Sequence, residues 1–141
     1  MWPAFFWWRP RLDLDPLSEA RLRGLEPETA RRARALLVAA AAELGRFAVT
    51  SGRRTFEEQT ALYAQGRTAP GPIVTYAPPG TSLHESGRAF DLAPLDRHGK
   101  PYWPETPALW SALGKLGEAQ GLRWGGRWQV PDRPHFERRG P

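Results

Sequence analysis

The chain has 141 residues, 40% of them hydrophobic and 25% charged, which is ordinary for one soluble globular domain. It contains no cysteine, which excludes disulfides, thiolate zinc sites and cysteine nucleophiles, so any metal site must be built from His, Asp and Glu. The formal net charge of +5 favours polyanionic partners such as nucleic acid or an anionic bacterial envelope. Because the arginines are spread along the chain and no nucleic-acid-binding motif accompanies them, we expect no nucleic-acid partner and keep electrostatic contact with an anionic envelope open.

An aromatic run from Trp2 to Trp8 opens the chain and ends at Arg9. It is far shorter than the roughly 20 residues of a membrane-spanning helix, and it lacks the basic start and small-residue cleavage site of a secretory signal. We expect an N-terminal strand or plug packed on the core. Contact with a membrane surface or the cell wall is the alternative, because tryptophan suits interfaces.

The first predicted helix covers residues 26–45. Pro27 suits its first turn, and Gly45 suits its end. Residues 47–50 follow as a short predicted strand, and residues 51–52 as a turn.

A second helix is predicted where Thr55 and Glu58 have the spacing of a capping box. Gly66 is expected to close this helix. Residues 68–81 are rich in Gly, Pro and Thr and are predicted to form a long loop. Long loops inside compact domains are often functional.

The second half of the chain alternates short strands with one more helix. Residues 96–100 are predicted to form a polar turn that exposes His98, and residues 106–121 a helix with leucines on one face. The predicted strands are residues 88–92, 122–124 and 135–137. This alternation predicts an α+β fold with helices packed on one small sheet.

Two of the three histidines, His84 and His135, lie in polar segments that also contain Asp91 and Asp132. Zinc takes nitrogen and oxygen ligands in a tetrahedral set, and a catalytic site keeps one position for water. His84, Asp91 and His135 could supply the three protein ligands, and manganese or cobalt suits the same donors. By spacing alone each histidine is more often a surface or core residue, and Asp132 is a good turn former, so the metal site is a hypothesis.

Other polar side chains could support such a site. Asp132 could take a proton from a water and pass it to a leaving amine. Arg54, after the 51–52 turn, could bind the oxyanion of a tetrahedral intermediate or a substrate carboxylate. Glu85 and Glu137 are candidate partners for the second ring nitrogen of a metal-bound histidine. For Glu137 an ordinary solvated charge is an equal alternative.

Three longer motifs lie between residues 45 and 138. They read TSGRRTFEEQ at 50–59 with LYAQGRT at 62–68, SLHESGRAFD at 82–91, and GLRWGG at 121–126 with DRPHF at 132–136. In this order the segments resemble the zinc D-alanyl-D-alanine carboxypeptidases and dipeptidases of the VanY and VanX type. Within that family they look closest to the phage endolysins that are L-alanyl-D-glutamate peptidases.

The resemblance implies a small central antiparallel sheet with helices packed on it and one zinc ion per chain on the sheet face. The zinc ligands it implies are His84, Asp91 and His135. It gives Asp132 the role of catalytic carboxylate, as in the endolysin branch, and Arg54 that of the substrate-binding and oxyanion-stabilising arginine. Arg53 stands where the family often has an aromatic residue. Ser82 and Glu137 are expected to support the ligands.

The predicted function is therefore hydrolysis of the peptide stem of bacterial peptidoglycan by a monomeric zinc endolysin, between L-Ala and D-Glu. Removal of a terminal D-amino acid by a D,D- or L,D-carboxypeptidase is the alternative, and a non-catalytic wall-binding module is a remote one. We expect the protein in the host cytoplasm before release and then at the cell wall or periplasm. We also expect a single domain over 1–141, with an N-terminal segment and helix at 1–44 and a catalytic core at 45–138.

Overall fold

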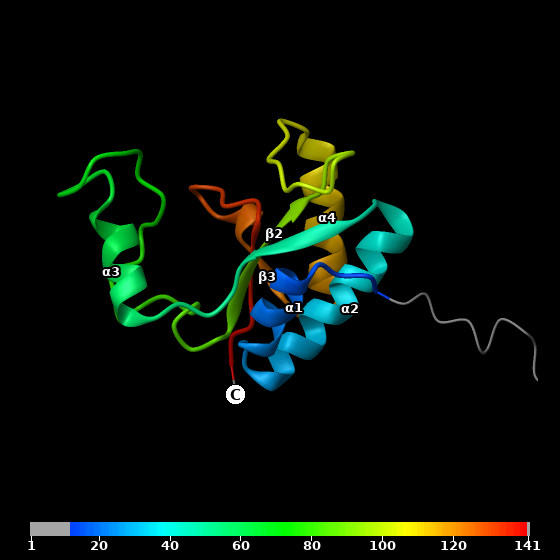
Figure 1. Ribbon diagram of the computed structural model, residues 1–141, viewed down its shortest axis with the longest axis horizontal. Helices are drawn as coiled ribbons and strands as arrows, with labels where there is room; N and C mark the ends of the chain where they lie inside the picture. Colours follow the sequence, from blue (N-terminus) through cyan, green and yellow to red (C-terminus); the bar gives the residue numbers. More distant parts are fainter. Residues whose placement is uncertain (1–11, 141) are drawn as a thin grey trace, which may run out of the picture.

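A computed structural model of the chain describes residues 12–140, in which four α-helices accompany a four-stranded antiparallel sheet (Figure 1). The predicted α+β class is confirmed. The aromatic run from Trp2 to Trp8 lies outside the described residues, so its expected packing stays a prediction. None of the helices between residues 12 and 140 combines the length and the apolar character that crossing a membrane requires.

Apart from helix α1, the elements agree closely with the predicted ones. The helices are α1 (Pro16–Arg23), α2 (Pro27–Glu43), α3 (Phe56–Ala64) and α4 (Pro107–Ala119). The strands are β1 (Phe47–Ser51), β2 (Ala89–Pro94), β3 (Arg123–Trp124) and β4 (His135–Glu137), and a short 3-10 turn, η2 (Gly125–Arg127), follows β3. The sheet order β1-β2-β4-β3 places β2 and β4 side by side in its middle.

Helix α1 is an element that the sequence prediction missed. Asp15 caps it by accepting hydrogen bonds from the backbone N–H and the hydroxyl of Ser18, at 2.9 and 2.6 Å. The Ser18 hydroxyl oxygen also accepts from the backbone N–H of Val49 at 2.9 Å, which ties α1 to β1. An aspartate followed by Pro16 at the first helical position is a helix-start signal that was available in the sequence.

The pairing of β2 with β4 decides which residues face the core. In this antiparallel register Phe90 lies opposite Phe136, and Asp91 lies opposite His135. The two phenylalanine rings are fully buried and stack with their centroids 5.8 Å apart, in the same core as residues of α1, α2 and α4. Because side chains alternate across a strand, Asp91 and His135 share the opposite face of the sheet.

Gly117 of α4 is required by the close approach of this helix to the sheet. A Cβ at this position would lie 2.3 Å from a ring carbon of Phe136. We therefore expect Gly117→Ala to lower the free energy of unfolding by about 1–3 kcal/mol through overpacking, although alanine favours helix over glycine by about 1 kcal/mol. Urea unfolding measures this effect, and exposed Lys115→Ala on the same helix should change stability by less than about 0.5 kcal/mol. A stabilised Gly117→Ala protein would show that the helix can move away.

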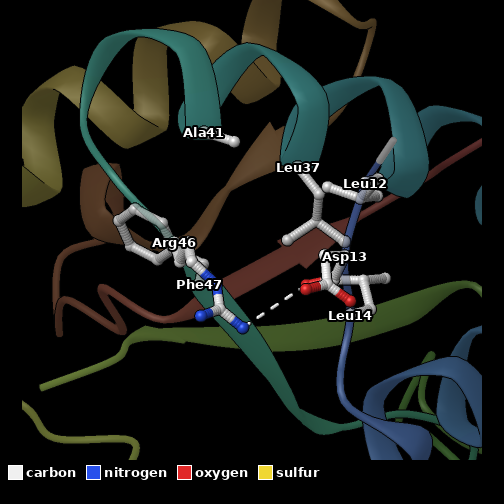
Figure 2. A pocket seen from close by; sticks show the side chains of 7 residues that line it. All are labelled: Leu12, Asp13, Leu14, Leu37, Ala41, Arg46 and Phe47. Carbon is white, nitrogen blue, oxygen red and sulfur yellow. Dashed lines mark hydrogen bonds between the residues drawn. The ribbon is translucent and has the colours of Figure 1, made fainter. Parts of the chain in front are cut away.

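A small, mostly apolar cavity of about 120 Å³ lies where the described chain begins (Figure 2). The residues that line it are Leu12, Asp13, Leu14, Leu37, Ala41, Arg46 and Phe47. The Arg46 guanidinium donates a long hydrogen bond of 3.5 Å to the Asp13 carbonyl. The cavity contains none of the residues proposed for the site, so we regard it as a packing feature.

Helix α3 and the loop at 68–81 form an arm set apart from the other helices (Figure 1). The predicted capping box of Thr55 and Glu58 is confirmed, with both reciprocal hydrogen bonds present. Within α3 only Gln59 is buried. Large apolar side chains are exposed on the arm: Phe56, Ile73, Val74 and Tyr76.

Candidate metal centre

Three side chains from separate parts of the chain converge on the open face of the sheet. They are His84 from the loop before β2, Asp91 from β2 and His135 from β4. His84 Nε2 lies 3.2 Å from His135 Nδ1, and Oδ1 of Asp91 lies 3.4 Å from the first nitrogen and 3.3 Å from the second. The three atoms thus form a nearly equilateral triangle.

The size of this triangle fits a tetrahedral zinc ion. Zinc binds imidazole nitrogen and carboxylate oxygen at about 2.0–2.2 Å, so two ligand atoms of a regular tetrahedron lie about 3.3–3.6 Å apart. The three distances of 3.2–3.4 Å meet this requirement closely, without any rearrangement. The fourth tetrahedral position remains for a water or a substrate oxygen, as in catalytic zinc sites.

The hydrogen bonds behind the two histidines orient their lone pairs toward this point. His84 Nδ1 donates to the Gly52 carbonyl at 2.8 Å, because a carbonyl can only accept. His135 Nε2 lies 2.9 Å from a carboxylate oxygen of Glu137 and donates to it. In the neutral form of each ring the proton therefore lies on the outer nitrogen, which leaves the inner nitrogen free to bind a metal.

Asp91 provides the clearest sign that a cation belongs here. Its Oδ1 is buried and, among the residues that the structure describes, has no hydrogen-bond donor. Its other oxygen, Oδ2, lies 3.4 Å from Nη2 of Arg54. A buried carboxylate oxygen that faces two imidazole lone pairs is costly unless a positive charge lies between them.

The pKa values in the cluster follow from this arrangement. Burial alone would raise the pKa of Asp91, but its contacts with His135 and His84 hold that pKa below the usual range. Burial likewise works against protonation of His135, yet Asp91 and Glu137 raise its pKa to about 9. The same negative surroundings that favour a proton on His135 favour a metal cation, and metal binding must release that proton.

Asp132 lies in the loop before β4, beside the triangle. Its Oδ2 is 4.0 Å from His135 Nδ1, and about half of the side chain is exposed. Burial of the carboxylate and the nearby charge of Asp91 raise the pKa of Asp132. Gly125 makes this placement possible, since a Cβ there would lie 2.6 Å from the Asp132 carbonyl oxygen. A carboxylate that is accessible and less acidic than usual suits a proton-transfer role.

Arg54 reaches the cluster from the segment between β1 and α3. Besides its contact with Asp91, its Nη1 donates to the side-chain oxygen of Gln59 at 3.3 Å. Gln59 is fully buried, and its amide nitrogen donates to the Ala77 carbonyl at 2.9 Å and to the Thr75 hydroxyl at 3.3 Å. Gln59 therefore connects Arg54 to the 68–81 loop. No role was predicted for Gln59 from the sequence, although a glutamine inside a capped helix can indicate a side chain that forms hydrogen bonds to neighbouring segments.

Of the remaining residues expected near the site, two contact a histidine of the triad and one does not. Glu137 is buried and contacts His135, as expected of a supporting residue, and the solvated-charge alternative is wrong. The Ser82 hydroxyl accepts from the backbone N–H of His84 at 3.2 Å and so steadies the loop. For Glu85 the prediction is wrong, because its carboxylate accepts from the backbone N–H groups of Gly80 and Ser82 in its own turn.

His98, which was predicted to lie outside the site, is exposed in a turn as expected.

Two further neighbours of the cluster were not found from the sequence. The ring of Trp128 packs against the His135 ring with centroids 4.9 Å apart. The Gly52 carbonyl holds His84, and no sequence signal could identify it because it is a backbone atom. Both contacts restrict how the imidazoles can turn.

We expect Glu137→Gln to weaken zinc binding about 10- to 100-fold, because it removes the charge behind His135 while keeping an acceptor of the same shape. A competition titration with a fluorescent zinc chelator measures this change. Glu118→Gln is the matched control, since Glu118 pairs with Arg127 on the surface. Equal zinc affinity in the Glu137→Gln and native proteins would contradict a supporting role for this carboxylate.

Two imidazoles and one carboxylate, with a further carboxylate and a guanidinium beside them, are the groups that a zinc metallopeptidase requires. The chain is 37% identical over 121 residues to the Bacillus subtilis peptidoglycan L-alanyl-D-glutamate endopeptidase CwlK, an alignment that covers 80% of this chain and 72% of that protein. The family model described as D-alanyl-D-alanine carboxypeptidase, of peptidase family M15, matches residues 76–138. The chain belongs to the M15 peptidase family.

Solved structures share the fold. The Serratia marcescens L-Ala D-Glu endopeptidase ChiX superposes with a TM-score of 0.64 at 22% identity, with 86% of each chain covered. The vancomycin resistance D,D-pentapeptidase VanY, solved as the E175A mutant with Zn(II), superposes with a TM-score of 0.61 at 19% identity, covering 82% of this chain and 73% of VanY. At these identities the likeness concerns the fold alone.

Proposed function

We propose that this chain is a zinc peptidase that hydrolyses the peptide stem of bacterial peptidoglycan between L-Ala and D-Glu. The observation that carries the proposal is the triangle of His84, Asp91 and His135, which has the dimensions of a tetrahedral zinc site and an orphaned carboxylate oxygen. The choice of bond is supported by the names of CwlK and ChiX, which are both endopeptidases for that bond.

The proposed mechanism assigns one task to each polar side chain. Zinc held by the triad would polarise the scissile carbonyl and acidify the attacking water. Asp132, accessible beside the triad, takes the proton of that water and delivers it to the leaving amine. Arg54, held by Asp91 and Gln59, stabilises the oxyanion of the tetrahedral intermediate.

Digestion of purified peptidoglycan, followed by mass spectrometry of the products, tests this proposal. New peptides with N-terminal D-Glu, which disappear on chelation, are the expected result. A carboxypeptidase is the second candidate, because the matching family model carries that description and the Arg54 guanidinium could bind a terminal carboxylate. Release of single D-amino acids would establish this second activity and overturn the first.

The proposal extends to a single zinc ion per chain in a monomer. It also includes the role suggested by the resemblance to phage endolysins, in which the protein passes from the host cytoplasm to the wall and lyses the cell. Metal analysis of protein with a measured molar mass tests the stoichiometry. Clearing of a suspension of permeabilised cells tests the lytic role, and wall turnover without clearing would contradict it.

A further inference from the structure

An open groove adjoins the proposed active site on the side of the arm. It encloses about 550 Å³ and is lined by Arg53, Arg54, Thr55, Phe56 and Glu85. Arg54 lines the groove and also lies beside the metal triad, because its guanidinium contacts Asp91. A peptide bound across the triad can therefore extend into this groove.

Among the described residues, Arg53 is the cation of the groove that has no polar partner. In the described part of the chain its guanidinium makes no hydrogen bond or ion pair, whereas the guanidinium of neighbouring Arg54 is held by Asp91 and Gln59. The Arg53 side chain is exposed. An unpaired arginine beside a catalytic centre is available to bind an anionic group of the substrate.

The backbone around Arg53 is held rigidly against a proposed metal ligand. On one side the Gly52 carbonyl accepts from His84 Nδ1 at 2.8 Å, and on the other the Arg54 N–H donates to the His84 carbonyl at 2.9 Å. Residue 53 therefore keeps a constant position relative to the triad. A contact made by its side chain can select substrates instead of only attracting them.

Two other residues of the groove complete its chemistry. The Glu85 carboxylate is the opposing charge, but its oxygens already accept three hydrogen bonds from the N–H groups of Gly80 and Ser82. The ring of Phe56 is 57% exposed and offers an apolar wall. A ligand with a carboxylate on a short aliphatic chain fits this combination.

Glutamate presents this chemistry in the proposed substrate. It has two carboxyl groups, of which the peptide bond to the next residue uses only one, so the residue after the scissile bond carries a free carboxylate. We propose that Arg53 binds this free carboxylate of D-Glu and makes the enzyme prefer stems with D-Glu over stems in which that carboxylate is amidated. This inference rests on the proposed function.

The experiment uses zinc-loaded full-length protein and two stem peptides that differ only in a carboxylate or a carboxamide on D-Glu. We expect the native enzyme to cleave the carboxylate form with a kcat/KM about 5- to 10-fold higher, mainly through KM, as for a partly exposed charged hydrogen bond. Arg53→Gln should remove this preference by lowering kcat/KM for the carboxylate peptide far more than for the amidated peptide, while Arg53→Lys should keep part of it. Arg97→Gln in the distant 96–100 turn controls for net charge and should change neither rate.

A second measurement separates this inference from the proposed reaction. Calorimetry on zinc-loaded Asp132→Asn protein, with and without Arg53→Gln, reports the binding preference when hydrolysis is strongly slowed. If neither peptide is cut between L-Ala and D-Glu but the Arg53-dependent preference persists, the proposed function fails and the carboxylate subsite stands. The inference is overturned if native protein does not discriminate between the peptides, or if Arg53→Gln weakens both equally.

Discussion

Asp132→Asn should reduce kcat by about 10²–10⁴-fold while leaving zinc bound, because it removes the proton acceptor without changing the shape of the side chain. The structure places this carboxylate 4.0 Å from His135 Nδ1 and outside the ligand triangle, so its loss need not disturb the metal. Steady-state hydrolysis of a stem peptide, with metal analysis of the same sample, gives both quantities.

The matched control for this variant is Glu105→Gln. Glu105 is a nearly fully exposed carboxylate whose only described ion pair is a 3.9 Å contact with Arg133, so neutralising it changes the charge without touching the triad. This control should keep its activity within about 2-fold, as expected of a surface substitution. A fall of less than 3-fold in Asp132→Asn would eliminate the proton-transfer role. Loss of zinc in that variant would instead make Asp132 a metal-binding residue.

Removing zinc should abolish hydrolysis and lower the melting temperature. Restoring zinc at about 1,000 times its Kd should raise the melting temperature again, by on the order of 10 °C. Binding to the folded state alone contributes about 4 kcal/mol at that concentration, and 1 kcal/mol corresponds to roughly 3 °C for a domain of this size. The physical reason lies at Asp91, whose buried Oδ1 has no hydrogen-bond donor among the described residues and gains a partner when the metal binds. Thermal unfolding with chelator and then with excess zinc measures the shift.

Asp91→Asn provides the decisive variant for this prediction. It keeps the shape of the side chain but removes the ligand charge, so zinc should neither raise its melting temperature nor restore activity. Asp132→Asn, in contrast, should show the full zinc-dependent shift with little activity. A chelated native protein with full activity, or an Asp91→Asn protein with the native shift, would contradict the triad as the metal site.

The elements of this fold were largely predictable because their signals are local. The capping box of Thr55 and Glu58 is a pattern of four residues, and the confirmed helix α3 begins there. The alternation that turns Phe90 inward and Asp91 outward is a property of the strand itself. Helix α1 shows the limit of such reading, since its start signal of Asp15 and Pro16 was present but overlooked.

The sequence by itself also determined the chemistry that any site could use. Without cysteine, a metal site could only be built from histidines and carboxylates, and His84 and His135 were the two histidines outside the predicted polar turn. The resemblance in the three motifs pointed to the same residues, and family membership agrees with it. The assignment of each residue to a role remains a proposal.

Only the tertiary structure decided how these groups meet. The β2–β4 register sets Asp91 opposite His135, and the Gly52 carbonyl turns His84 toward them, so three lone pairs converge within 3.4 Å. Gln59 is held behind Arg54 by its contacts with Thr75 and Ala77 of the 68–81 loop, and Arg53 shares its groove with Glu85 from another segment. Periodicity and capping act over a few residues, whereas distances between atoms 40 or 50 positions apart follow from strand pairing and packing.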